Sequence, residues 1–244
     1  MHREEQPLSE RFARSYGSPG EGPLTLGLLR AFWPFLLVFF VAGWLLRAGL
    51  PAPEMGASAA GVLLLLLAVG SIFLLRWSDR RLGHFLKGAR GEESVARELA
   101  YLSPEHTVFN GLRLPEGKQD FDHVVVGPTG VYVIETKNWR GAISFREGRL
   151  LADGAEPGRS PLKQVKAATA ELTEFLSGAG CGSVVHPVLC FVSTELPEDV
   201  MNVNGVLICS AERLTGIFGE CLEDPLPVDL RENVVFALRK TFES

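Results

Sequence analysis

Among the five charged residues of a largely apolar stretch of the chain, residues 119–141, which reads QDFDHVVVGPTGVYVIETKNWRG, three point to a functional site. They are Asp122, Glu135 and Lys137. The valines, isoleucine and tyrosine around the Gly-Pro-Thr-Gly turn are typical of a buried β-hairpin. Charges on buried strands destabilise a fold unless they are paired or bind a metal. This hairpin is therefore a candidate functional site.

The turn predicts which residues of the hairpin face each other. A two-residue loop and a four-residue loop within 127–130 give the same register, in which Asp122 stands opposite Glu135 and Asp120 opposite Lys137. Because side chains alternate between the faces of a sheet, all four charged side chains are expected on one face. A three-residue loop would break this register.

Two opposed carboxylates repel each other, and a divalent cation offsets the repulsion. Mg²⁺ or Mn²⁺ prefers oxygen ligands, usually one or two carboxylates together with water and a substrate phosphate. Asp122 and Glu135 are therefore the expected metal ligands, and Lys137 is placed to stabilise charge on a phosphate or to orient a water. This pattern predicts phosphodiester hydrolysis. The competing interpretation is an ordinary exposed ion pair between Asp120 and Lys137.

The rest of the sequence indicates which elements hold this hairpin. Hydrophobic periodicity predicts helices and strands on both sides of it, with Ser160 as an N-cap and Pro161 as the first residue of a helix. The expected fold class is α/β, with a mixed central sheet flanked by helices. The expected elements are helices over 91–102, 160–176, 211–219 and 230–242, strands over 106–114, 183–193 and 205–210, and a second hairpin over 142–152.

Two apolar runs without any charged residue, 31–46 and 57–75, precede this domain. The second would span about 28 Å as a helix, close to the hydrocarbon thickness of a bilayer. Buried core helices are the alternative, but a helix that is apolar on every face is uncommon in so small a domain. We expect a transmembrane helical hairpin. Lys and Arg on both outer flanks then predict a cell-membrane protein with both termini and the soluble domain in the cytoplasm.

Four parts of the chain are expected on this basis. Residues 1–27 form a flexible cytoplasmic tail, 28–76 the two transmembrane helices, 77–90 a basic juxtamembrane connector and 91–244 the soluble domain. The four cysteines have no metal-ligand spacing and are expected to be reduced, packed thiols. They are Cys181, Cys190, Cys209 and Cys221.

The soluble part resembles the nuclease-related domain family, NERD, of the PD-(D/E)XK nuclease superfamily. The resemblance rests on GARGEESVARELAYL, QDFDHVVVGPTGVYVIETKNWRG and SPLKQVKAA, which occur in that order within residues 88–176. It implies a restriction-endonuclease-like α/β core with Asp122 and Glu135 as metal ligands and Lys137 as the charge-stabilising lysine. It also implies that Glu92 is the additional acidic residue of that superfamily and Gln164 its helix glutamine.

Other residues near the hairpin have simpler expected roles. Some relatives have a tyrosine four positions after the glutamine, where this chain has Ala168. His123 is expected to be packed or hydrogen-bonded on the face opposite to Asp122 rather than to bind a metal. Trp139 is expected to be a core aromatic, with a base-stacking platform as the alternative.

The charge of the domain argues against general nucleic-acid binding. From residue 84 onward, 16 Lys and Arg stand against 23 Asp and Glu, whereas affinity for nucleic acid depends on Lys and Arg at the phosphates. A local basic rim is still available from Lys137, Arg140, Arg146, Arg149, Lys163 and Lys166. Three functions stay open: a membrane-tethered Mg²⁺-dependent nuclease acting on DNA or RNA, a catalytically silent scaffold that binds nucleic acid or protein, and a phosphoesterase acting on a nucleotide or other small phosphate.

Overall fold

The computed structural model describes residues 12–20, 57–220 and 225–243, together with isolated positions between 25 and 43. The chain divides into two compact units. One unit comprises Met1–Glu21 and Gly88–Ser244, and the other is the intervening segment Gly22–Lys87. All five predicted site residues belong to the first unit.

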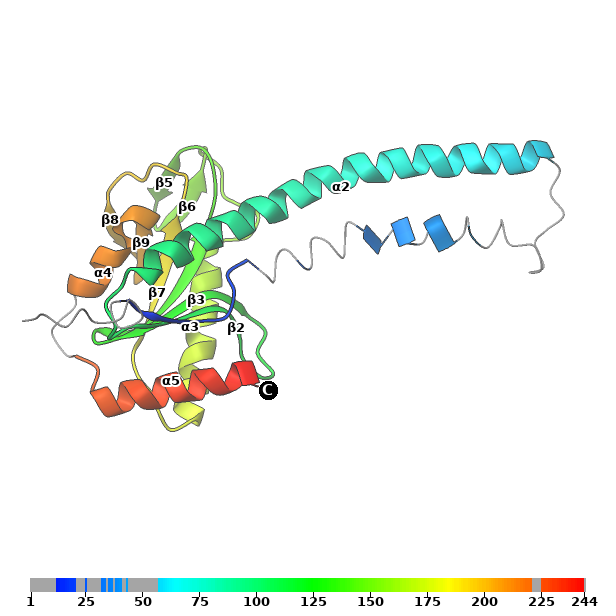
Figure 1. Cartoon of the computed structure of the whole chain (residues 1–244). Helices are drawn as coiled ribbons and strands as arrows, with labels where there is room; N and C mark the ends of the chain where they lie inside the picture. Colours follow the sequence, from blue (N-terminus) through cyan, green and yellow to red (C-terminus); the bar gives the residue numbers. More distant parts are fainter. Residues whose placement is uncertain are drawn as a thin grey trace, which may run out of the picture. The chain divides into compact units, whose positions relative to one another are not determined.

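A mixed sheet, seven-stranded within the described residues, lies at the centre of the first unit (Figure 1). The strand order is β1-β2-β3-β4-β7-β9-β8. β2, β3 and β4 are antiparallel neighbours, β4, β7 and β9 run parallel, and the edge strand β1 runs parallel to β2. The strands are β1 (Arg14–Tyr16), β2 (Thr107–Arg113), β3 (Asp120–Gly127), β4 (Gly130–Lys137), β7 (Val185–Phe191), β8 (Val200–Val203) and β9 (Val206–Ser210).

Helices cover both faces of the sheet and form two cores. On one face, α3 (Pro161–Gly178) and α5 (Val228–Glu243) pack on side chains such as Val124 and Val133. On the other face, the C-terminal part of α2 (Ala57–Ala100) and α4 (Leu214–Glu220), which follows the short 3-10 helix η2 (Ala211–Arg213), pack on side chains such as Val125 and Ile134. Both faces of β3 and β4 are thus buried, which explains their continuous apolar runs. The predicted mixed sheet flanked by helices is confirmed.

Turn residues with positive φ close two hairpins. Glu147 and Gly148, with φ of 52° and 73°, join β5 (Ile143–Arg146) to β6 (Arg149–Ala152), as predicted. Asn204 and Gly205, with φ of 54° and 78°, join β8 to β9. The β8–β9 hairpin was not predicted, although Asn-Gly between apolar residues is a strong hairpin signal.

The helix α2 is continuous over residues 57–100 and therefore joins three segments that were expected to be separate. It runs through the second predicted transmembrane segment, the predicted basic connector and the predicted helix 91–102. Among the residues that the structure describes, no helix is long and apolar enough to cross a membrane. Half of the first predicted segment, 31–46, lies outside the described residues.

Part of the predicted flexible tail is instead ordered on the sheet. β1 pairs with β2, with Ser15 beside Val108, and the Asn110 amide donates a hydrogen bond to Ser15 Oγ at 2.9 Å. The Tyr16 ring stacks on Phe109 with the ring centroids 5.3 Å apart. Residues 12–20 are ordered because they supply main-chain partners to the edge of the sheet, a tertiary effect that composition alone does not reveal.

The cysteines of the described residues agree with the expectation of reduced, packed thiols. Cys181, Cys190 and Cys209 are free and buried. Cys221 lies outside the described residues.

Candidate active site

The register predicted from the turn is confirmed for the five cross-strand pairs of β3 and β4, which end at His123 opposite Ile134. Asp122 and Glu135 are the next residues in that register, but the paired part of the two strands stops before them. β3 instead continues its pairing with β2 as far as Asp120. The two strands therefore separate at the two predicted metal ligands.

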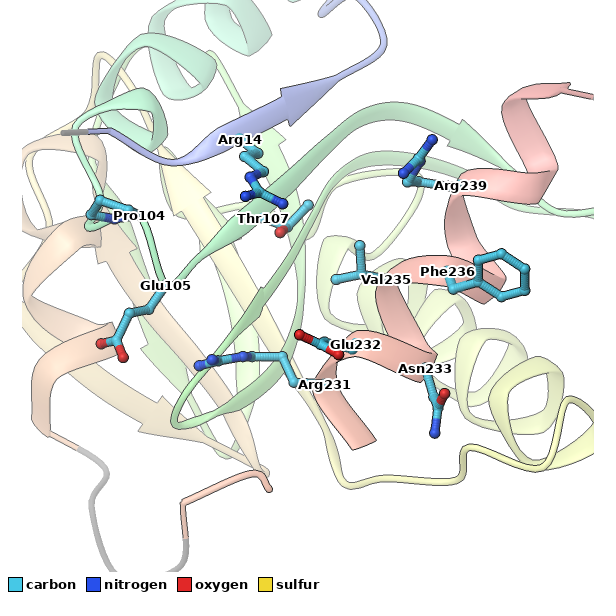
Figure 2. Close-up of a pocket in the computed structure, with 10 residues that line it drawn as sticks. All are labelled: Arg14, Pro104, Glu105, Thr107, Arg231, Glu232, Asn233, Val235, Phe236 and Arg239. Atoms are coloured by element: carbon cyan, nitrogen blue, oxygen red, sulfur yellow. The ribbon is translucent and has the colours of Figure 1, made fainter. Parts of the chain in front are cut away.

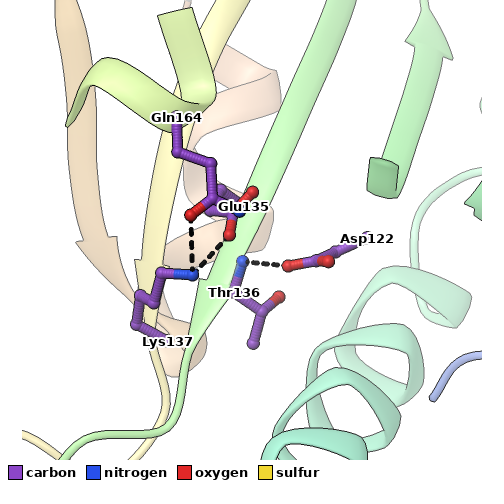
Figure 3. Close-up of polar contacts among 5 residues, drawn as sticks. All are labelled: Asp122, Glu135, Thr136, Lys137 and Gln164. Carbon is purple, nitrogen blue, oxygen red and sulfur yellow. Dashed lines mark hydrogen bonds and ion pairs between the residues drawn. The ribbon is translucent and has the colours of Figure 1, made fainter. Parts of the chain in front are cut away.

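The Asp122 carboxylate lies in the opening between β3 and β4. Its Oδ2 accepts a hydrogen bond from the main-chain N–H of Thr136 at 2.7 Å (Figure 3). Phe121 and Val124 pack in the same core although two residues lie between them, so the alternation of side chains breaks at Asp122. The pairing of β2 with β3 skips Gly111 and Asp122, and Gly111 has a φ of 62°, a conformation that favours glycine. The prediction that Asp122 simply shares a face with Glu135 is therefore refined, because Asp122 leaves the regular pleat.

Lys137 connects β4 to the helix α3. Its Nζ forms an ion pair with Glu135 Oε1 and donates a hydrogen bond to Gln164 Oε1 at 3.4 Å (Figure 3). The Glu135 side chain is 4% exposed and the Lys137 side chain 18%, so the pair is largely shielded from water. The competing ion pair between Asp120 and Lys137 is not formed, because Asp120 pairs with Arg113 Nε at 2.7 Å.

α3 is held at this position by the capping residues that the sequence predicts. Ser160 Oγ accepts a hydrogen bond from the Lys163 N–H at 3.4 Å, and Pro161 is the first residue of the helix. Gln164 lies on the first turn that follows, which brings its amide to Lys137. The N-cap therefore fixes where the glutamine meets the end of β4.

Glu92 supplies a third carboxylate from α2. Gly91 lets the helix approach the end of β4, since a Cβ at this position would lie 2.8 Å from the Cβ of Asn138. Glu92 is buried, and its Oε2 accepts a hydrogen bond from the Gly20 N–H at 2.9 Å. The ordered N-terminal segment thus holds the Glu92 side chain in place.

The three carboxylates lie close enough to influence one another. Burial raises the pKa of Asp122 well above its usual value, and the charges of Glu135 and Glu92 raise it further. Burial also raises the pKa of Glu92 to about 6, with Glu135 adding to the effect, whereas the Gly20 N–H and Lys137 act in the opposite direction. Buried acids of this kind favour either a proton or a cation between them.

The donor set fits a hard divalent cation whose remaining ligands come from water or substrate. In the described part of the chain, no group of three or more His, Cys, Asp or Glu side chains is arranged to hold a metal ion by itself. Mg²⁺ commonly takes only one or two carboxylates from the protein and completes its shell with waters and phosphate oxygens. Asp122 and Glu135 suit this mode, because both are carboxylates at the same opening of the sheet.

Two neighbouring residues have the structural roles expected for them. His123 is fully buried, and its Nδ1 hydrogen-bonds with Asn110 Oδ1 at 2.7 Å. Trp139 packs edge to face against Phe191, with the ring centroids 5.9 Å apart. His123 is thus a hydrogen-bonded core residue, and Trp139 is a partly buried aromatic packed against the core.

Sequence reasoning missed three contributions of the main chain to the site: the N–H of Gly20, the N–H of Thr136 and the absence of a side chain at Gly91. Gly20 and Glu92 are 72 residues apart, so no local pattern connects them. The positions of Gly91 and Thr136, each next to a predicted site residue, were the available signals. Contacts of this kind depend on how α2 and the N-terminal segment pack.

One comparison with known proteins matches the part of the chain that carries this site. The family model of the nuclease-related domain, NERD, matches residues 87–192. The matched segment contains Glu92, Asp122, Glu135, Lys137 and Gln164. No curated protein and no solved structure matches the chain. The match supports a nuclease-like function for this part of the chain.

Proposed function

We propose that this protein is a metal-dependent nuclease that hydrolyses phosphodiester bonds of DNA or RNA. The observation that carries the proposal is the separation of β3 from β4 at Asp122, which leaves Asp122, Glu135 and Lys137 around one opening at the end of the sheet. Carboxylates held this close together repel each other, and a divalent cation between them would offset that repulsion.

In this proposal, Asp122 and Glu135 hold Mg²⁺ or Mn²⁺. The bound ion would polarise a phosphate oxygen and lower the pKa of a coordinated water. Lys137 already contacts Glu135, so its ammonium is placed to stabilise the negative charge that develops on the phosphate. Gln164 fixes the direction of Lys137 through its side-chain oxygen. Glu92 adds negative charge beside Asp122 and strengthens the preference for a cation.

The approach of a nucleic acid is supported by the basic rim near the end of β4. Arg140 lies in the loop after β4, Lys163 and Lys166 lie on the first turns of α3 near Gln164, and all three are exposed. Arg146 is also exposed, on the β5–β6 hairpin, whose turn contacts Asn204 between β8 and β9. Arg149 belongs to the same hairpin but pairs with Glu156 at 2.9 Å. Exposed cations around an acidic metal site are what a phosphodiester backbone requires.

A phosphoesterase acting on a nucleotide or other small phosphate is the second candidate. It is favoured by the excess of Asp and Glu over Lys and Arg from residue 84 onward, 23 against 16. A small substrate needs only the metal and Lys137, whereas a long polyanion is repelled by the remaining surface.

We also propose that residues 28–76 anchor the domain to the membrane. In support, α2 exposes a set of large apolar side chains, and the intervening segment Gly22–Lys87 leaves and returns to the same unit. Any crossings of a bilayer would therefore be even in number, with the tail and the soluble domain on the same side, and the flanking Lys and Arg favour the cytoplasmic side. The exposed apolar side chains are Val62, Leu65, Leu66, Val69, Ile72 and Phe73.

Fractionation of cells, followed by extraction of the membranes at alkaline pH, tests the anchor. Retention of the full chain in the membrane pellet is expected. Release into the supernatant together with peripheral proteins would contradict it.

The nuclease proposal is tested with the purified full chain on plasmid DNA, single-stranded DNA, RNA and bis(p-nitrophenyl) phosphate, with Mg²⁺ or Mn²⁺ and with EDTA. Metal-dependent cleavage of a nucleic acid is expected, with a loss of at least about 100-fold for Glu135→Gln. Glu174→Gln, an exposed position on α3, is the matched control. Hydrolysis of the small ester alone would favour the phosphoesterase, and a folded protein without any hydrolysis or Mn²⁺ binding would favour the silent scaffold.

A further inference from the structure

The chain leaves the first unit and returns to it at one place, beside a carboxylate of the candidate active site. It leaves after Glu21 and returns at Gly88. A Cβ at Gly20 would lie 2.9 Å from the Cβ of Ala89, and the Gly20 N–H donates a hydrogen bond to Glu92 Oε2 at 2.9 Å. The residues that flank the intervening segment on its two sides are thus joined through Glu92.

Residues 12–20, which we call the N-terminal strap, reach Glu92 by a path that depends on two glycines. Gly17 and Gly20 both have a φ of 75°, a conformation that favours glycine. A Cβ at Gly17 would overlap the main-chain oxygen of Asn110 on β2. Any larger residue at Gly17 would therefore push the strap away from the sheet without touching Glu92.

The strap is held by few buried contacts. Tyr16 stacks on Phe109, and Ser15 Oγ accepts a hydrogen bond from the Asn110 amide. Of residues 12–20, only Gly20 is buried. Segments with so little buried surface open locally at a free energy well below that of global unfolding. The strap can therefore detach while the rest of the domain stays folded.

The start of the strap also lacks support from the neighbouring helix. Arg14 of β1 pairs with Thr107 of β2, and a pocket of about 520 Å³ lies between this end of the two strands and α5 (Figure 2). Arg14 is exposed. The main chain at Arg14 is thus open to a protease whenever β1 leaves β2.

The attached strap keeps Glu92 in the arrangement that favours a cation. Its N–H stabilises the charged form of the carboxylate and limits the directions in which the side chain can point. The charge of Glu92 acts on Asp122, so the two carboxylates are neighbours in this arrangement. A detached strap would let the Glu92 side chain turn toward solvent and away from Asp122.

We propose that the N-terminal strap regulates the metal site: the attached strap raises the affinity for Mg²⁺ or Mn²⁺, and its release lowers that affinity. This regulation rests on the proposed function, because it acts on the same metal. Since the strap leads into the intervening segment Gly22–Lys87, any change that draws the two flanks of that segment apart would break the contact between Gly20 and Glu92. By linkage, a bound metal ion in turn holds the strap on the sheet.

The first test follows trypsin cleavage after Arg14 in the purified full chain, with saturating Mn²⁺ and with EDTA. A strand paired within a sheet is a poor protease substrate, so the rate reports the fraction of detached strap. We expect Mn²⁺ to slow this cleavage at least about fivefold in the native chain. In Glu92→Gln, Mn²⁺ should leave the rate unchanged, because the carboxylate that links metal and strap is gone.

The second test measures the coupling in the other direction. Gly17→Ala is expected to speed cleavage after Arg14 and to lower the Mn²⁺ affinity, measured by calorimetry, at least about fivefold. Tyr16→Ala removes the stacking on Phe109 and is a second way to loosen the strap. Gly216→Ala, at an exposed glycine of α4 with no atom within 4 Å of the added Cβ, is the matched control and retains the native affinity and cleavage rate.

The outcomes separate this proposal from the proposed function. Native Mn²⁺ affinity in a variant whose strap is released would overturn the regulation and leave the metal site standing. Protection by Mn²⁺ that persists in Glu92→Gln would also overturn it, as would a strap that neither Gly17→Ala nor Tyr16→Ala releases. A native chain that binds no Mn²⁺ would contradict the metal site itself, and the regulation with it.

Discussion

The main-chain N–H of Thr136 donates a hydrogen bond to the Asp122 carboxylate at 2.7 Å, beyond the point where the ladder between β3 and β4 has ended. The Asp122 side chain thus accepts the hydrogen bond that a main-chain carbonyl of β3 would accept in a regular ladder. The same carboxylate is the one that burial and the nearby charges of Glu135 and Glu92 make unfavourable as an anion. Asp122 therefore combines a structural hydrogen bond with a buried charge, and substitutions can separate the effects of the two.

The two roles of Asp122 predict opposite effects of two substitutions in the metal-free protein. Asp122→Asn keeps an acceptor for Thr136 and removes a buried like charge, so we expect it to stabilise the fold by about 1 kcal/mol. Asp122→Ala leaves the Thr136 N–H without a partner and is expected to cost about 1–3 kcal/mol. Urea denaturation in EDTA measures both. Equal destabilisation by the two variants would show that the charge of Asp122 has no energetic cost in the fold.

Glu92 predicts a pH dependence of stability. Its pKa is raised from 4.5 to about 6 in the folded protein, so the folded state binds this proton more tightly than the unfolded state does. The contribution of Glu92 to the free energy of unfolding of the metal-free protein therefore falls as the pH rises from about 4.5 through 6. Above that pH it stays low. Asp122 acts in the same direction, because its pKa is also raised.

Glu92→Gln removes this titration. At pH 7.5 in EDTA we expect the variant to be more stable than the native chain by up to about 2 kcal/mol, and the difference should shrink toward pH 5. Denaturation curves at several pH values provide the measurement, with Glu93→Gln on the exposed face of the same helix as the control. A difference that does not change with pH would contradict the assigned pKa.

The approach of α2 to β4 predicts a contrast between two glycines of one helix. Gly88→Ala meets nothing within 4 Å, so we expect the usual gain of about 0.5–1 kcal/mol for alanine in a helix. Gly91→Ala would place a Cβ 2.8 Å from that of Asn138, which moves the helix and Glu92 away from the site. Thermal denaturation and Mn²⁺ titration of the two variants test this. Equal melting temperatures and equal Mn²⁺ affinities of the two variants would show that the close approach of α2 to Asn138 does not position Glu92.

Lys137 is expected to act on the substrate rather than on the metal. Lys137→Met should therefore retain Mn²⁺ binding but lower phosphodiester hydrolysis by about 100-fold or more. Lys118→Met, an exposed lysine in the loop before β3, is the control. Loss of Mn²⁺ binding together with activity would instead assign Lys137 a role in assembling the metal site.

The sequence predicted those features of the site that depend on residues close together in the chain. The turn between β3 and β4 predicted the register, and Ser160 with Pro161 predicted where α3 begins. These features follow from turn chemistry and helix capping, which act over a few residues. The same reasoning placed Glu135 and Lys137 on one face of β4, where they form an ion pair.

The features of the site that the sequence did not predict depend on contacts between residues far apart in the chain. The strands separate at Asp122 because Gly111 takes a φ of 62° and Thr136 finds a side-chain acceptor, and neither is visible in a pattern of apolar residues. β1 has only three residues and is ordered by its partner β2. Gly20 reaches Glu92 only because that edge strand exists.

The most direct measurement of the central claim is calorimetric titration of the full chain with Mn²⁺ at neutral pH. We expect one ion per chain, with affinity reduced at least about tenfold in Asp122→Asn and in Glu135→Gln and unchanged in Glu174→Gln. Affinity should also fall below about pH 6, where Glu92 takes up a proton. A chain that binds no Mn²⁺, or binds it equally well in all three variants, would contradict a metal site between β3 and β4.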